Sequence, residues 1–313
     1  GPSVYRSIFR RPAMNSTLDE NGVQPALQPA GLGAELTLGL TNAMLLAALV
    51  IFAVVMACLW LAWRRPVTGR NWWIVVGGVA FPLVVLGALV IGSAVVLRAA
   101  SGPSGDAAVT VEVTGYQYWW DVVHDPNGRA LRDANEIWVP VGQKVRIVLK
   151  SDDVIHSFWV PKVAGKMDMI PGRVNEMTLV ANEAGRFRGQ CAEFCGLSHP
   201  LMAFEMVAVP PDEYQAYLDR LDRPVAPSED PLAEGGREVF LGEGCGACHA
   251  VRGVSEGTGA GPDLSRLGAR ASLGAGMWRT NVGNIAGWVA DVQDMKPGAK
   301  MPSYNLLEGP RLR

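Results

Sequence analysis

Two long uncharged segments near the start of the chain limit its fold more than any other feature. Residues 36–63 contain 28 consecutive uncharged side chains, and residues 71–97 contain 27. A helix of about 20 apolar residues crosses about 30 Å of hydrocarbon, so each segment can span a membrane with some tilt. Helices of a soluble core usually have about 8 to 20 residues and one polar face. The sequence therefore predicts a transmembrane hairpin over residues 36–98, with Pro82 kinking its second helix.

Charged residues around the hairpin predict its orientation. Arg64, Arg65 and Arg70 lie in the short loop between the two segments, and basic loops of this kind stay in the cytoplasm. The basic residues nearer the N-terminus lie more than about 20 residues before the first span, beyond the distance over which this rule is counted. The N-terminal extramembrane segment, residues 1–35, and everything after Arg98 should therefore face outward.

Two globular domains are predicted after the hairpin. Residues 99–108 are rich in Gly, Ser, Pro and Ala, which is typical of a linker. Residues 109–222 contain short β-rich runs separated by turn signals, which predicts an antiparallel sandwich or barrel that ends in a short helix. A Pro-rich linker at residues 223–231 precedes a Gly-rich, helix-compatible unit at residues 232–313. The net charge of −2 offers no basic surface for a nucleic-acid backbone, so no nucleic-acid partner is expected.

Five residues with metal-binding side chains gather around one loop of the β-rich domain. Cys191, Cys195, His199 and Met202 occur within 12 residues, and His156 lies 35 residues before the first of them. Two thiolates can bridge two soft metal ions, each with one imidazole, while a thioether serves as a weak axial ligand. This ligand set favours copper. A disulfide between the cysteines and a structural zinc ion are the alternatives.

A second metal motif lies in the C-terminal unit. Cys245, Cys248 and His249 form the pattern C-x-x-C-H, in which two thiols attach a c-type haem and the histidine binds its iron. The same pattern also occurs by chance or as a redox dithiol, but the predicted outward side of the membrane is where such haem is attached. A thioether from Met295 or Met301 would be the second axial ligand, and the proline that follows Met301 favours that residue.

The stretches around the first motif resemble subunit II of cytochrome c oxidase. They read HSFWVP from His156, DMIPGRVN from Asp168 and GQCAEFCGLSH from residue 189. The resemblance covers about residues 29–209 and implies a cupredoxin Greek-key barrel that holds the dinuclear CuA centre. By position it implies six copper ligands: the bridging thiolates of Cys191 and Cys195, the imidazoles of His156 and His199, the thioether of Met202 and the backbone carbonyl of Glu193.

The same resemblance implies further roles and shows two departures. The side chain of Glu193 would hold Mg²⁺ at the interface with subunit I, and Tyr118, Trp119 and Trp120 would pass electrons toward copper. The family usually has Trp at the position of Tyr118, where an external cytochrome c delivers its electron. We hypothesise that a tethered haem domain removes the need for that Trp. Val75 stands where the family commonly has a Glu at a proton channel, so no proton-entry role is expected.

Residues 232–304 resemble a class I cytochrome c domain, which is all-α. The two resemblances together imply a multidomain membrane protein: a helix hairpin, an all-β cupredoxin domain and the cytochrome c domain. Its implied place is the bacterial inner membrane, with two spans and with both termini and both metal domains on the periplasmic side.

The implied function is that of the electron-transfer subunit of a caa-type cytochrome c oxidase. Electrons would come from an external donor, such as a cytochrome c or a quinol-cytochrome c reductase complex, and leave for subunit I, which carries haem and CuB. Subunit III and membrane lipid are further implied partners, and no catalytic residue for oxygen is expected in this chain. The small subunit of a CuA-containing nitric oxide reductase is one alternative. A non-redox scaffold subunit of a quinol oxidase is another, and it predicts lost copper ligands.

Overall fold

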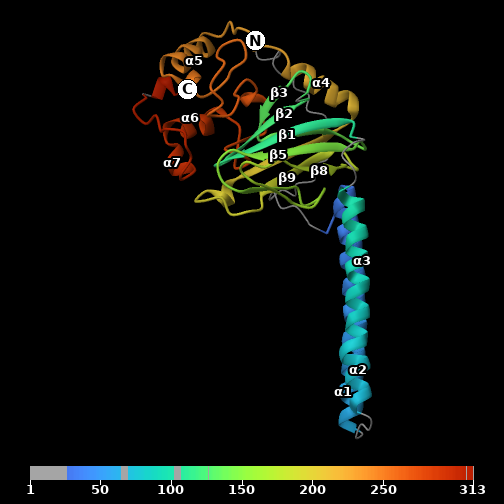
Figure 1. Ribbon diagram of the computed structural model, residues 1–313. Helices are drawn as coiled ribbons and strands as arrows, with labels where there is room; N and C mark the ends of the chain where they lie inside the picture. The colour runs from blue at the N-terminus through green and yellow to red at the C-terminus, as the bar shows by residue number, and fades with distance from the viewer. Residues whose placement is uncertain (1–26, 65–69, 102–106, 126, 308, 313) are drawn as a thin grey trace.

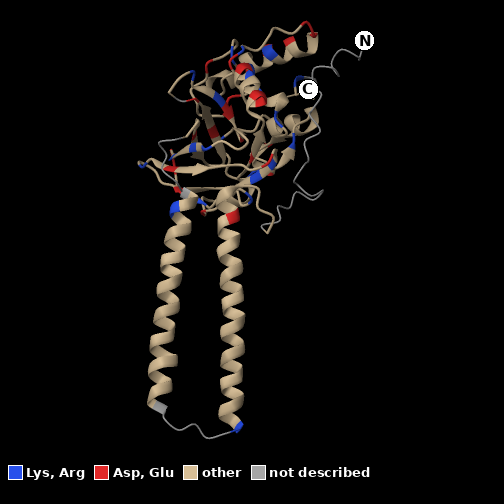
Figure 2. Cartoon of the chain, turned by 90° about the vertical axis from the view of Figure 1, so that its right-hand side faces the viewer, with Lys and Arg blue, Asp and Glu red and all other residues tan. Residues whose placement is uncertain are grey.

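Two long helices extend from a β-rich head in the computed structural model of the chain, which describes residues 27–64, 70–101, 107–125, 127–307 and 309–312 (Figure 1). The first helix is α1 (Leu32–Arg64). The second is continuous through α2 (Arg70–Val75), the π-helical turn η1 (Val76–Ala80) and α3 (Phe81–Ser101). Figure 2 shows them side by side, with charged residues only near their ends. The loop with the predicted cytoplasmic arginines is largely outside the described residues.

Apolar side chains cover the outside of these helices along their whole length. Leu32–Arg64 and Asn71–Ala100 have windows of mean hydropathy 2.9 and 2.7, and 0% of either window is buried. A helix of a soluble core would bury such side chains, so both helices are candidate membrane spans. The π-helical turn ends two residues before Pro82, whose missing N–H and bulky ring distort a regular helix at that place.

The head begins with a sandwich of two five-stranded sheets. The first sheet has the order β3-β2-β1-β5-β8, made of β3 (Leu131–Ala134), β2 (Trp119–His124), β1 (Val109–Tyr116), β5 (Val145–Ser151) and β8 (Asn175–Leu179). The second has the order β4-β10-β9-β6-β7, made of β4 (Glu136–Pro140), β10 (Ala203–Val209), β9 (Gly185–Cys191), β6 (His156–Trp159) and β7 (Met167–Met169).

The sheets are mixed rather than purely antiparallel as the sequence predicted. The β1–β5 and β10–β4 pairs are parallel, and the remaining pairs of the two sheets are antiparallel. Alternate side chains of β1 and β5 are buried, which is the period of a strand with one face on a core. The sandwich also holds the start of the hairpin, because the Ala30 amide donates to the Lys162 carbonyl (2.7 Å) and the Leu32 amide to the Val180 carbonyl (3.3 Å).

His124, the only histidine of the sequence outside the two metal motifs, is buried in the sandwich. It lies in β2 with 0% exposure, and α4 (Pro211–Leu221) covers it. Its Nδ1 lies 3.3 Å from the Tyr214 hydroxyl, and its Nε2 lies 3.5 Å from the Tyr217 hydroxyl. Burial lowers the pKa of His124 to about 4, so the ring is neutral near pH 7.

The C-terminal unit is built from short elements. They are α5 (Pro231–Gly242), η4 (Cys245–Ala247), η5 (Leu267–Ala269), β11 (Ser272–Leu273), β12 (Trp278–Arg279), α6 (Val282–Ala290), α7 (Val292–Met295) and η6 (Gly309–Arg311). The β11–β12 pair is a small addition to the all-α expectation. The Asp230 carboxylate caps α5 by accepting from the Leu232 amide (2.9 Å). Neither α5 nor α6 contains a buried residue.

This unit lies directly against the sandwich rather than apart from it on its linker (Figure 1). The Ala203 amide at the start of β10 donates to the Ala275 carbonyl (2.9 Å). Arg270 pairs with Asp133 of β3 at 2.8 Å through its Nε, and both side chains are almost fully buried (3% and 2% exposed). A buried ion pair of this kind costs several kcal/mol to break on one side, so it fixes the position of the unit.

Candidate metal centres and the contact between them

The sulfur ligands of the first candidate site sit where β9 ends. Cys191 is the last residue of β9, and Cys195 lies in the loop that follows. A short 3-10 helix, His199–Leu201, returns the chain to β10 with Met202 between them. His156 begins β6, which pairs with β9, so the imidazole and the first thiol come from neighbouring strands. The sheet therefore brings together residues that are 35 positions apart.

Six atoms of the predicted copper set converge. The Cys191 and Cys195 sulfurs lie 3.8 Å apart, and both cysteines are free. A disulfide needs about 2.05 Å, so none is formed. Four further contacts complete the cluster: His156 Nδ1 to Cys191 Sγ (3.8 Å), the Glu193 carbonyl to Cys191 Sγ (3.2 Å), His199 Nδ1 to Cys195 Sγ (3.5 Å) and Met202 Sδ to Cys195 Sγ (3.8 Å).

Each imidazole lies next to a different sulfur, and this arrangement bears on which metal the site can hold. His156, Cys191 and Cys195 have ligand atoms that all lie within 4.8 Å of one another, and His199 is not in that group. One tetrahedral zinc ion would need all four ligands at about 2.0 to 2.3 Å from one point. Two ions that share the sulfurs, each with one imidazole, fit this arrangement better. Soft thiolate and thioether ligands favour copper for those ions.

The two thiols of the cluster have pKa values shifted in opposite directions. Hydrogen bonding with Cys195 lowers the pKa of the Cys191 thiol against the effect of burial, and the contact with His156 lowers it further. The same coupling raises the pKa of Cys195. The pair therefore holds one thiolate readily at neutral pH, and cation binding favours loss of the second proton.

Asp153 contacts the ring nitrogen of His156 that does not face Cys191, and no sequence motif pointed to this residue. Its Oδ1 lies 2.9 Å from His156 Nε2, while its Oδ2 accepts from the Gln117 amide (2.8 Å) and from Lys300 Nζ (3.0 Å). Burial alone would raise the pKa of Asp153, but these hydrogen bonds hold it well below its usual range. An Asp three residues before a candidate metal-binding His is the signal that could have been noticed, because carboxylates often orient such ligands.

The predicted aromatic path occupies three different environments. Trp120 is fully buried, with its ring centroid 6.1 Å from that of His156 and 5.0 Å from that of Phe204. Trp119 stacks on Tyr116 at 4.8 Å. Tyr118 is only 6% exposed.

Tyr118 is covered by the C-terminal unit. Its hydroxyl lies so close to Gly196 and Gly298 that a Cβ at those glycines would be 2.5 Å and 3.5 Å away. Its backbone carbonyl accepts from Lys296 Nζ at 2.7 Å. The position that would face an external donor in the family is therefore an internal contact in this chain.

The C-x-x-C-H residues lie just after α5, in the 3-10 helix η4 and the loop that follows it. His249 Nδ1 lies 2.8 Å from the Pro262 carbonyl, and Ser255 Oγ donates to the His249 carbonyl at 2.8 Å. Because a carbonyl accepts only, Nδ1 must carry the proton, which leaves Nε2 as the basic nitrogen. Gly261 packs so closely that a Cβ there would lie 2.5 Å from the imidazole Cε1. This is the tautomer that iron ligation needs, so His249 fits a haem.

Both candidate axial methionines lie near helix α6. Met301 Sδ accepts from Trp288 Nε1 at 3.2 Å, and Met295 Sδ lies 3.7 Å from where a Cβ on Gly287 would be. Trp278 and Trp288 pack together at 5.8 Å, as expected for packing residues. Both thioethers therefore face the interior of the unit.

Glu193 points its side chain away from the sulfur cluster. The carboxylate is 45% exposed and lies 3.9 Å from Lys166 Nζ. Phe194 and Leu197 in the same loop are 75% and 79% exposed. An exposed carboxylate beside exposed apolar side chains is the composition of a contact surface.

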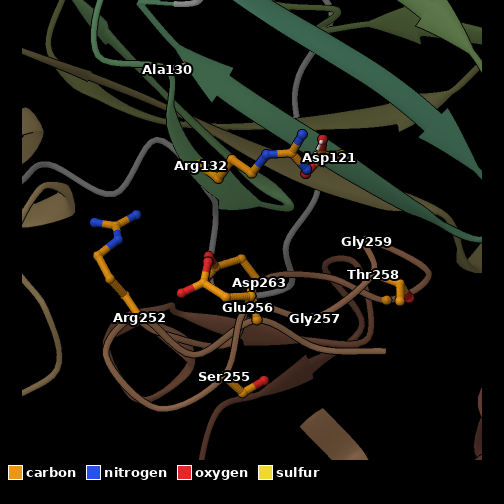
Figure 3. A pocket seen from close by; sticks show the side chains of 12 residues that line it. Asp121, Ala130, Arg132, Arg252, Ser255, Glu256, Gly257, Thr258, Gly259 and Asp263 are labelled. Atoms are coloured by element: carbon orange, nitrogen blue, oxygen red, sulfur yellow. Dashed lines mark hydrogen bonds and ion pairs between the residues drawn. The ribbon is translucent and has the colours of Figure 1, made fainter. Parts of the chain in front are cut away.

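A cavity of about 360 Å³ lies at the seam between the sandwich and the C-terminal unit. Figure 3 shows Arg132 paired with Asp121 on the sandwich side, while Arg252, Glu256 and Asp263 line it from the C-terminal unit. Its lining contains three carboxylates and two guanidinium groups, so most of the charge around the cavity cancels. It is separate from the sulfur cluster.

Fold and site together define a β-sandwich protein with two candidate membrane-spanning helices, a thiolate and imidazole cluster and a second domain with the c-type haem pattern. Residues 108–209 match the family "Cytochrome C oxidase subunit II, periplasmic domain", and residues 233–309 match the cytochrome c family. The first family implies copper and the second implies haem.

Two curated relatives are similar to this chain over about the same length. The chain is 42% identical over 200 residues to cytochrome c oxidase subunit 2 of Alkalihalophilus pseudofirmus, over 64% of this chain and 57% of that protein. It is 34% identical over 209 residues to the subunit 2 of Bacillus subtilis, over 64% of this chain and 58% of that protein. The match thus spans a little over half the length of these relatives.

Proposed function

We propose that the chain is the electron-transfer subunit of a haem-copper cytochrome c oxidase. The observation that carries this proposal is the convergence of two thiols, two imidazoles, a thioether and a carbonyl beside a docked domain with the C-x-x-C-H pattern. When bound, haem and the copper pair supply one-electron carriers, in the order external donor, haem, copper and haem of subunit I. Oxygen reduction and proton pumping belong to subunit I.

Each predicted residue has a role in this proposal. Cys245 and Cys248 would attach the haem covalently, while His249 and Met301 would bind its iron. The six ligands of the sulfur cluster would hold the copper pair: His156, Cys191, the Glu193 carbonyl, Cys195, His199 and Met202. Strands β6 and β9 place His156 and Cys191, and the loop between β9 and β10 places the other four, an arrangement that would limit rearrangement when the charge on the metal changes and so favours electron transfer over catalysis.

The surroundings of the ligands have defined tasks. Trp120 and Phe204 keep water from the buried side of His156, and Asp153 holds its Nε2 proton. The Pro262 carbonyl holds the Nδ1 proton of His249.

The exposed loop around Glu193 is the proposed contact with subunit I. Its carboxylate is free to bind Mg²⁺ there if Lys166 moves aside, and Phe194 and Leu197 would be covered by that subunit. Subunit III, lipid and an external cytochrome c or reductase complex are the further proposed partners. By the positive-inside rule, both metal domains and both termini lie on the periplasmic side of a bacterial inner membrane.

A metal analysis of the purified chain tests the proposal. We expect two copper ions and one covalent haem per chain, the haem remaining attached under denaturing conditions. Zinc in place of copper, or no copper after careful reconstitution, contradicts the copper assignment. Oxygen uptake by the whole complex then separates an oxidase from a nitric oxide reductase.

A further inference from the structure

One carboxylate touches both candidate metal regions. Asp153 contacts the outer nitrogen of His156 (2.9 Å) with one oxygen and the Lys300 ammonium of the C-terminal unit (3.0 Å) with the other. The Asp153 side chain is 14% exposed, His156 is fully buried and Lys300 is 60% exposed. A continuous polar path of two contacts therefore runs from the C-terminal unit to a proposed copper ligand.

The segment that carries Lys300 is held on the sandwich at two further points. Lys296 Nζ, on a residue that is 2% exposed, donates to the carbonyls of Tyr118 (2.7 Å) and Gly274 (2.8 Å). The Pro297 carbonyl accepts from Ser198 Oγ at 2.7 Å, next to His199. These contacts fix the backbone, so the Lys300 ammonium reaches Asp153 only while the C-terminal unit is docked.

We infer that Lys300 is a positioning residue for the copper centre, acting through the Asp153 carboxylate on the imidazole of His156. The inference rests on the proposed function. A carboxylate behind a ligating histidine fixes the ring and increases electron donation to the metal. A cation on the far oxygen withdraws part of that negative charge. Docking of the haem domain therefore makes the copper centre a better electron acceptor at the moment when its donor is in place.

The size of the effect follows from exposure. Exposed ion pairs contribute about 0.2 to 1 kcal/mol, because water and salt screen them. We therefore expect Lys300→Met to shift the equilibrium distribution of an electron between copper and haem by about 1.4- to 5-fold, toward the haem. The shift should shrink as ionic strength rises.

Reductive titration of the purified full chain, followed in the separate copper and haem absorption bands, measures this distribution. Lys166→Met is the matched control, since it removes a lysine of similar exposure (51% against 60%) that lies beside the same metal site and pairs with Glu193 instead of Asp153. Lys300→Arg keeps the charge and should restore the distribution of the unmodified chain. No shift in Lys300→Met, or an equal shift in Lys166→Met, overturns the inference.

A double-mutant cycle separates the path through Asp153 from a general field effect. In an Asp153→Asn background, Lys300→Met should change the distribution by less than half of its effect in the unmodified chain. An undiminished effect there also contradicts the inference. Failure of the proposed function itself looks different, because the unmodified chain would then show no copper band, whereas failure of this inference leaves that band normal.

Discussion

The sandwich and the C-terminal unit differ most in what fills their interiors. The sandwich has a continuous core of buried side chains, from Val111 and Val113 in β1 to Phe187 in β9 and Phe204 in β10. Among the described residues of the C-terminal unit only six are buried: Asp263, Arg270, Leu273, Ala275, Val292 and Lys296. Three of these, Arg270, Ala275 and Lys296, form hydrogen bonds directly with the sandwich. A unit with so thin a core of side chains depends on the haem and on its neighbour to complete its interior.

The difference shows two ways of building a redox site. Strands β6 and β9 place His156 and Cys191, and the loop between β9 and β10 places the other four candidate copper ligands, so the sandwich fold itself brings that site together. In the C-terminal unit the apolar side chains Leu232, Leu241 and Val282 are 62%, 43% and 65% exposed rather than packed in a core. We therefore expect the first site to depend on the strands around it and the second to form around its cofactor.

Blocking haem attachment should separate the behaviour of the two domains most strongly. In the double variant Cys245→Ser, Cys248→Ser we expect the C-terminal unit to lose its folded structure, while the sandwich stays folded and binds copper. Limited proteolysis in residues 232–313 and the copper absorption band measure the two halves separately. The matched control is Cys195→Ser, which should abolish the copper band and leave both domains resistant. Protease resistance of the haem-free unit would contradict the idea that haem is its core.

Arg270→Met should have the next largest effect, because it leaves Asp133 charged and buried. We expect a loss of about 3 to 5 kcal/mol in the free energy of unfolding of the C-terminal unit. Denaturant titration followed by haem absorption measures it. Arg311→Met is the control, since Arg311 pairs with Glu243 at the surface (50% and 29% exposed) and should contribute about 1 kcal/mol or less. Equal effects of the two variants would mean that docking contributes nothing to the unit's stability.

Acid should weaken the sandwich through His124, which has no counterpart in the C-terminal unit. Because the pKa of His124 is about 4 in the folded chain and about 6.5 when unfolded, the unfolded state binds the extra proton between these values. Its stabilising contribution is complete above about pH 6.5 and is lost as pH falls toward 4. The total is up to about 3 kcal/mol.

The His124→Gln variant tests this pH dependence. As pH falls from 6.5 to 4, the unmodified chain should lose more unfolding free energy than the variant does. Taking the difference cancels the carboxylates that titrate in the same range. A difference that does not depend on pH would show that His124 is not the group responsible.

Local sequence patterns predict the helices and the metal motifs of this chain. Features that depend on pairs of residues far apart in the sequence could not be predicted in this way. The apolar runs, the helix at residues 211–221 and both metal motifs depend on neighbours in sequence. Strand β9 is hard to recognise in the sequence, since its alternating Arg186 and Arg188 conceal the buried face. The docking of the C-terminal unit was also missed, because it depends on pairs such as Arg270 with Asp133, 137 positions apart, which no local pattern reveals.

The choice between Met301 and Met295 gives the smallest effect on stability and the finest test of the second site. Leu replaces Met with nearly the same volume, so each variant should cost about 1 kcal/mol or less in unfolding free energy. Only Met301→Leu should remove the near-infrared band of thioether-ligated haem and lower its potential, since loss of a thioether ligand favours the oxidised iron. Met295→Leu, which also removes a thioether near α6, is the matched control. If Met295→Leu removes the band instead, the Trp288 contact of Met301 is a packing contact, and Met295 is the axial ligand.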